Sequence, residues 1–129
     1  MIVDTSALCT ILFQESDRDT FVAAMEDAES LFMSAATLFE LHLVAMGRLR
    51  LEGEVRTGEL LTRFGIAVVA FDAEQERIAR RGFHRYGKGR HPAGLNFGDC
   101  FAYALAKHLG EPLLFKGDDF RKTDVTPAV

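Results

Sequence analysis

The chain has 129 residues, of which 48% are hydrophobic and 26% are charged, and its formal net charge is −4. This length fits one domain, residues 1–129, and the composition excludes a disordered or fibrous protein. No apolar run approaches the roughly 18 residues needed to cross a bilayer. The two cysteines indicate buried free thiols rather than a disulfide framework. We therefore expect a cytoplasmic protein without membrane contact.

Short apolar strands alternate with amphipathic helices along the whole chain. We expect strands at residues 1–3, 30–34, 66–71 and 113–115, and helices at residues 5–13, 16–25, 35–48, 52–64, 73–86 and 97–109. Gly65 and Gly110 are typical of helix ends. The run at 66–71 has no polar alternation, which predicts a parallel strand covered on both faces. The tail around residues 124–125 could add an edge strand. This order predicts an α/β fold with a central, mainly parallel sheet of four or five strands.

Acidic side chains follow or flank the ends of these strands. Asp4 ends the first strand, and Glu40 lies early in the helix after the second. Asp99 begins the helix that leads to the fourth strand, and Asp118 and Asp119 follow that strand. Because parallel strands end at the same edge of a sheet, these carboxylates should gather there. Carboxylates crowded together repel one another, and a divalent cation removes that penalty. The pattern favours a Mg²⁺ or Mn²⁺ site suited to phosphodiester hydrolysis.

Helix capping offers a structural explanation for two of these acids. Thr37 and Glu40 have the spacing of a capping box, and so do Asn96 and Asp99. Acids near a helix N-terminus are also stabilised by the helix dipole without any function. Each acid alone is therefore explained by structure, whereas their shared position at one sheet edge favours the metal site.

The segment from residue 77 to residue 91 is basic and contains no acid. Its six lysine and arginine side chains leave about −10 for the rest of the chain, so we expect one basic face. A charged run of this kind is usually a solvated helix face, but it also suits contact with the phosphates of a nucleic acid, which the resemblance described below implies to be RNA. Its candidate RNA-binding residues, nearest in sequence to Asp99, are Lys88, Arg90 and His91.

Several segments together resemble the PIN-domain ribonucleases, and within them the VapC toxins of type II toxin–antitoxin systems. The resemblance is carried by residues 1–7 (MIVDTSA), Glu40, residues 87–100 (GKGRHPAGLNFGDC), residues 113–120 (LLFKGDDF) and residues 123–124. It covers essentially the whole chain. The segments at 87–100 and 113–120 are highly specific, whereas VDTSA alone is only suggestive.

The resemblance implies a three-layer α-β-α PIN-like domain and a Mg²⁺-dependent endoribonuclease toxin, with Mn²⁺ as a possible substitute. Such a toxin cuts structured cellular RNA, commonly tRNA, and so arrests translation. Asp4 and Asp99 would be metal ligands, and Glu40 would complete the acidic pocket. The fourth catalytic acid would be Asp118 or its neighbour Asp119, of which we prefer Asp118.

The same resemblance suggests supporting residues and partners. Ser6 matches a hydroxyl that orients an acid or a water, although a helix-start role explains it equally well. Asn96 is a helix cap that could also reach the pocket. The implied partners are a small cognate antitoxin, a second copy in a homodimer, and a heterotetramer or larger complex with the antitoxin. Apolar surface for them could come from the helices that carry Phe21 and Phe39.

Three other functions fit parts of the pattern. A Mg²⁺-dependent phosphatase of the haloacid-dehalogenase type would need a second aspartate at position 6, where this chain has Ser6. A receiver-like signalling module would need an acidic pair after the first strand. The third is a PIN scaffold that binds RNA without cutting it, against which the presence of every acid argues.

Overall fold

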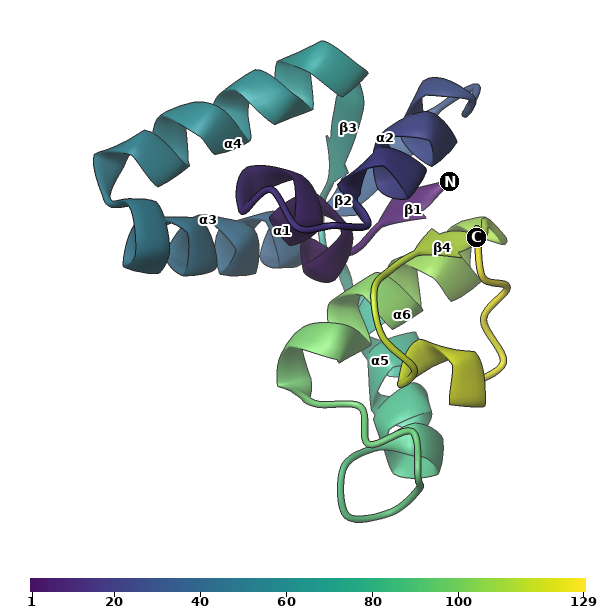
Figure 1. Ribbon diagram of the computed structural model, residues 1–129. Coiled ribbons are helices and arrows are strands. Elements are labelled where there is room, and N and C mark those ends of the chain that lie inside the picture. Colours follow the sequence, from purple (N-terminus) through teal and green to yellow (C-terminus); the bar gives the residue numbers. More distant parts are fainter.

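Four short parallel strands form the central sheet, in the order β3-β2-β1-β4 (Figure 1). The computed structural model describes residues 1–129. β1 (Ile2–Val3) lies between β2 (Leu31–Ser34) and β4 (Leu113–Leu114), whereas β3 (Ile66–Val69) pairs only with β2. The four expected strands and their parallel arrangement are confirmed.

Six α-helices connect and cover the strands. They are α1 (Thr5–Leu12), α2 (Arg18–Glu26), α3 (Ala35–Leu49), α4 (Leu51–Phe64), α5 (Ala73–Tyr86) and α6 (Phe97–Leu109), and a 3₁₀ turn, η1 (Phe120–Lys122), follows β4. Gly65 and Gly110 end α4 and α6 in the left-handed conformation, with φ of 62° and 67°. None of the helices has the length and apolar character that a bilayer crossing would require.

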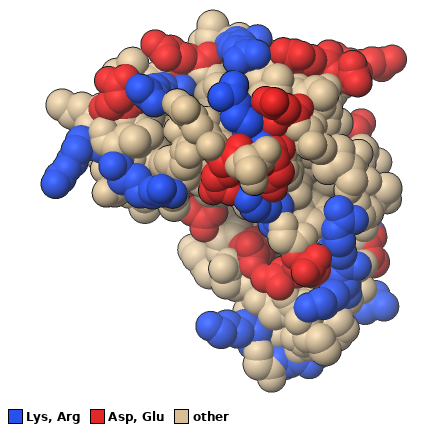
Figure 2. All heavy atoms as spheres, in the orientation of Figure 1, with Lys and Arg blue, Asp and Glu red and all other residues tan.

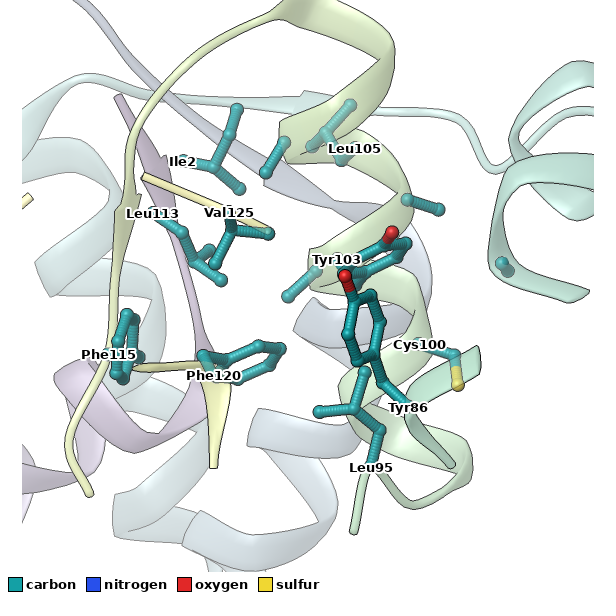
Figure 3. Close-up of a cluster of buried hydrophobic side chains, with 14 of the residues drawn as sticks. Ile2, Tyr86, Leu95, Cys100, Tyr103, Leu105, Leu113, Phe115, Phe120 and Val125 are labelled. Carbon is teal, nitrogen blue, oxygen red and sulfur yellow. The ribbon is translucent and has the colours of Figure 1, made fainter. Parts of the chain in front are cut away.

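The side chains of β1 point alternately into two separate cores, which makes the domain three-layered. Ile2 packs with residues of α5, α6 and the C-terminal segment, whereas Val3 packs with residues of α1 to α4. Both side chains are fully buried, as expected of a strand covered on both faces. Figure 3 shows the first core, in which Ile2, Leu113 and Val125 lie opposite Leu105 of α6. The three-layer α-β-α arrangement is thus confirmed.

The two edges of the sheet differ from what the sequence indicates. β3 is an edge strand, and its Ala67 and Val68 are exposed, so the expectation that it is covered on both faces was wrong. The apolar run reflects β propensity rather than burial, because only β2 lies beside it. The tail does not form a fifth strand: it makes one isolated bridge, between Leu113 and Pro127.

Both cysteines are free, as expected. Cys9 is half-buried on α1, and Cys100 is buried on α6. Burial is the main cause that raises the pKa of each thiol to about 11, and nearby carboxylates add to it. Neither cysteine is therefore a reactive thiolate at neutral pH.

A glycine allows α3 and α4 to pack closely as a helical hairpin. Gly53, in the first turn of α4, is buried, and a Cβ there would overlap the backbone carbonyl of Ala45 on α3. Gly58, one turn further along α4, faces open space. These two glycines on one helix therefore have opposite packing environments.

We expect Gly53→Ala to destabilise the protein by about 1–3 kcal/mol, because the new methyl group must displace α3. Gly58→Ala should instead stabilise it by about 0.5–1 kcal/mol, since alanine is the better helix former. Urea unfolding followed by circular dichroism measures both changes. Equal stabilisation by the two substitutions would contradict the close contact between α3 and α4.

Candidate active site

Asp4 lies directly after β1 and begins α1. Its Oδ2 accepts hydrogen bonds from the backbone N–H of Ser6, at 3.0 Å, and from the Ser6 hydroxyl, at 2.6 Å. The residue is only 5% exposed. Burial raises the pKa of Asp4, the bonds from Ser6 oppose the rise, and the charge of Glu40 adds to it. Asp4 is thus a buried carboxylate whose other oxygen, Oδ1, accepts no side-chain hydrogen bond.

The Ser6 hydroxyl connects Asp4 to the end of β4. It donates to Asp4 and accepts a hydrogen bond of 3.0 Å from the backbone N–H of Lys116, which follows β4 closely in the chain. Lys116 in turn forms ion pairs with Glu15 and Asp17 in the loop after α1. The segments after β1, α1 and β4 are therefore tied together beside Asp4. The sequence contained no signal for Lys116 in this position.

Glu40 lies in the second turn of α3, and its carboxylate makes no hydrogen bond or ion pair within the chain. The capping box that its spacing suggested is not formed, because α3 begins earlier and Ser34 caps it by accepting a bond from the N–H of Ala36 at 3.3 Å. The Glu40 carboxylate lies against Gly98, where any Cβ would overlap it. Gly98 therefore allows Glu40 to approach the start of α6.

Asp99 lies in the first turn of α6 and does form the expected capping box. Its Oδ2 accepts from the Asn96 N–H at 2.9 Å, and its own N–H donates to Asn96 Oδ1 at 2.9 Å. Burial raises the pKa of Asp99 to about 6 against the opposing bond from Asn96, and the charges of Asp4, Asp119 and Glu40 contribute to the rise. The cap holds Asp99 in place without removing it from the group of acids.

The two aspartates after β4 are not equivalent. Both are exposed, and Asp119 immediately precedes η1 without capping it. Asp119 is one of the charges that raise the pKa of Asp99, whereas Asp118 is not. The charges of Asp4, Glu40 and Asp119 therefore act on Asp99, and the role of Asp118, which we preferred from the sequence, stays a prediction.

The donor set fits a hard divalent cation. Each of the four residues offers carboxylate oxygen, and Asp4 and Asp99 use only one oxygen in side-chain hydrogen bonds. No three acidic, histidine or cysteine side chains lie close enough together to hold a metal ion between them. An ion here would have one or two direct carboxylate ligands and keep several waters, which is the usual coordination of Mg²⁺.

The loop between α5 and α6 carries the three candidate RNA-binding residues. Lys88 and Arg90 are exposed and have no carboxylate partner. Lys88 also lines a surface pocket to which Asn96 contributes. His91 is held within the loop: its Nδ1 accepts from the Ala93 N–H at 3.0 Å, and its ring lies 5.1 Å from that of Tyr86. Two of the three are therefore free cations near the start of α6.

The charge distribution is less simple than one basic face. Figure 2 shows lysine and arginine side chains over the lower end of the molecule, where α5 and the next loop lie, and further ones over the upper part. Acidic side chains gather near the middle of the view, between these areas. The basic segment is thus one of several basic areas that surround the acids.

Comparison with known proteins agrees with this fold. The PIN domain profile matches residues 1–125. The chain is 49% identical over 125 residues to the Ribonuclease VapC of Mycolicibacterium smegmatis, covering 97% of each chain. It is 46% identical to Ribonuclease VapC30 of Mycobacterium tuberculosis, covering 97% of this chain and 95% of the relative.

Two solved structures share the fold at low sequence identity. The crystal structure of Mycobacterium tuberculosis VapC20, described as a sarcin-ricin loop cleaving toxin, has a TM-score of 0.79 and 16% identity and covers 97% of this chain and 95% of its own. VapBC2 from Rickettsia felis, bound to a promoter DNA fragment, has a TM-score of 0.73 and 14% identity, with coverage of 98% and 95%. The chain belongs to the PIN-domain family, and within it to the VapC ribonucleases. This membership removes the phosphatase and receiver-like alternatives.

The raised pKa of Asp99 predicts a pH-dependent stability in the metal-free protein. The ordinary value is 3.8 and the folded value about 6, so between these the folded state holds a proton that the unfolded state has released. Stability contributed by this group is therefore present below pH 4 and lost as the pH rises toward 6 and above. We expect Asp99→Asn to gain stability relative to the wild type over this range, measured as Tm in EDTA from pH 4 to pH 7.

Asp124 is the matched control, since its pKa is lowered. Burial opposes the shift, but hydrogen bonds from Tyr103 and Lys107 outweigh it. Its contribution is fully present above its ordinary pKa of 3.8, so Asp124→Asn should be less stable than the wild type by a constant amount from pH 4 to pH 7. The assignment fails if both variants change in the same direction.

Proposed function

We propose that this protein is a Mg²⁺-dependent endoribonuclease toxin that hydrolyses phosphodiester bonds in structured cellular RNA such as tRNA and so arrests translation. Mn²⁺ would substitute for Mg²⁺, and the protein would act in the cytoplasm. The observation that carries the proposal is that three carboxylates from other segments, those of Asp4, Glu40 and Asp119, act on Asp99, with Glu40 lying against the neighbouring Gly98. Burial is the main cause of the raised pKa of Asp4 and of Asp99, and repulsion among the acids adds to it, a combination that is frequent at functional sites.

Each acid has a proposed role. Asp4 and Asp99 would hold the cation directly, each through the oxygen left free by its hydrogen bonds. Glu40 and Asp119 would complete the acidic pocket, and Asp119 replaces Asp118 as our preferred fourth acid because its charge reaches Asp99. The bound cation would lower the pKa of a water and stabilise charge on the phosphate. Ser6 would keep Asp4 oriented, and Asn96 would keep Asp99 at the start of α6.

Substrate contact would come from the loop beside these acids. Lys88 and Arg90 are exposed and unpaired, so their charges are available to backbone phosphates. His91 uses Nδ1 within the loop, which leaves Nε2 as the atom that could reach RNA. Contacts of this kind read the shape and charge of folded RNA more than its sequence.

Neutralisation would come from a small VapB-like antitoxin, with the toxin as a homodimer in a heterotetramer or larger complex. The related structure from Rickettsia felis is a VapBC complex. Exposed apolar side chains on α3 and α4 supply surface for such partners, among them Phe39 at 65% and Leu51 at 75% exposure. Phe21, which we expected to contribute, is buried. A PIN scaffold that binds RNA without cutting it is the second candidate, and the retained acids argue against it.

Substitution of the two proposed metal ligands tests the function. Asp4→Asn and Asp99→Asn should each reduce Mg²⁺-dependent cleavage of a tRNA transcript by at least about 100-fold, because an amide cannot replace a carboxylate on the cation. The measurement is the single-turnover cleavage rate, with circular dichroism as the control for folding. Full activity in either folded variant would refute the site.

The neighbouring aspartates after β4 provide a charge-matched pair. We expect Asp119→Asn to lose at least about tenfold in cleavage rate and Asp118→Asn to lose little, since the charge of Asp119 is among the causes that raise the pKa of Asp99. Both variants remove one exposed charge, so the net charge is the same. The opposite ranking would return the role to Asp118.

A further inference from the structure

An open hollow between α5 and α6 lies outside the group of acids. Its volume is about 770 Å³, and no acidic residue lines it. Four of its six lining residues have basic side chains. The lining residues are Ile78, Arg81, His84, Arg85, Tyr103 and Lys107.

The floor of the hollow is fixed by a close approach of the two helices. Gly82 of α5 is buried, and a Cβ there would overlap the ring of Tyr103 on α6. Tyr103 also packs beside Tyr86, with ring centres 6.1 Å apart, as the close-up in Figure 3 shows. Its hydroxyl donates to Asp124 Oδ1 at 2.9 Å. The basic side chains around Tyr103 therefore project from a rigid base.

The charges in the hollow are only partly neutralised. Lys107 pairs with Asp124 at 3.2 Å, whereas Arg81 and Arg85 are exposed and form no salt bridge. The Arg85 guanidinium lies 5.0 Å from the centre of the Tyr86 ring, which helps to orient it. Other basic residues on α5 do find partners, as Arg80 does with Glu76 at 3.0 Å. The hollow thus keeps two uncompensated guanidinium groups, with His84 between them in the chain.

The hollow lies one to two helical turns along α6 from Asp99. Asp99, Tyr103 and Lys107 are spaced four residues apart on α6. At 1.5 Å per residue, Tyr103 and Lys107 lie roughly 6 Å and 12 Å along the helix axis from Asp99. A polyanion held at the acids would therefore have to extend over one or two helical turns to reach the hollow.

We propose that this hollow binds the sugar-phosphate backbone of the RNA substrate at a distance from the bond that is cut. The guanidinium groups of Arg81 and Arg85 would each contact a phosphate, and planar guanidinium suits that contact better than ammonium does. The open form and the exposed cations fit an extended polyanion better than a small anion, because the one buried polar side chain in the lining, Tyr103, already donates its hydroxyl to Asp124. This inference rests on the proposed function, in which RNA is the substrate.

The double variant Arg81→Gln/Arg85→Gln tests the proposal through binding, apart from cleavage. Fluorescence anisotropy of a labelled tRNA transcript in EDTA measures affinity without turnover. We expect about tenfold weaker binding at low salt and a salt-dependence slope shallower by about 1 for each removed contact. In Mg²⁺, KM should rise while kcat stays the same. Arg56→Gln/Arg63→Gln on α4 removes the same charge elsewhere and should change neither quantity.

The outcomes separate the two proposals. Unchanged affinity and slope in the Arg81/Arg85 variant would overturn the RNA-binding role of the hollow, even if the wild type cuts RNA. Equal loss in the α4 variant would overturn it too, since net charge alone would then explain the effect. If no protein cleaves RNA but the Arg81/Arg85 variant still binds less tightly, the hollow stands and the nuclease function fails.

Discussion

Placing a carboxylate at the buried end of a two-residue strand is the constraint on which the rest of the site depends. Asp4 cannot move away from the core, because Ile2 and Val3 before it are fully buried between the two helical layers. The hydroxyl and N–H of Ser6 stabilise its charged form, but burial still raises its pKa. Every other acid that approaches this edge therefore meets a carboxylate that is held in place.

The other acids reach the same edge through different local devices. Ser34 caps α3, so that Glu40 lies in the second turn of this helix, and Gly98 has no side chain that would block the Glu40 carboxylate. The capping box with Asn96 holds Asp99 at the start of α6. Such crowding is unfavourable for an empty site and favourable for one that binds a cation. The energetic cost of the arrangement and its proposed chemistry thus have the same origin. The basic loop and the hollow on α5 and α6 supply the positive charge that the proposed contact with RNA phosphates requires.

Much of this was predictable from the sequence, and the failures have physical reasons. The spacing of the apolar residues located the strands and helices. Gly65 and Gly110 marked two helix ends, because glycine readily adopts the left-handed conformation in which many helices end. The parallel order then brought Asp4, Glu40 and Asp99 together. The choice between Asp118 and Asp119 stays a prediction, because it depends on the course of an exposed turn, which no periodicity describes. The exposure of β3 was not predicted, because an apolar, β-branched segment is found both in central strands and in edge strands, so its sequence does not distinguish the two positions.

The course of the tail has a consequence for how the sheet meets its surroundings. Leu113 of β4 donates its N–H to the Thr126 carbonyl and accepts from the Ala128 N–H, both at 2.9 Å, so a few residues occupy one margin of the sheet. The opposite margin, β3, has no neighbour beyond β2. Strand addition by another chain is thereby restricted to a single side. Because the tail covers the β4 edge, the two edges of the sheet differ, and only the β3 edge is open to a further strand.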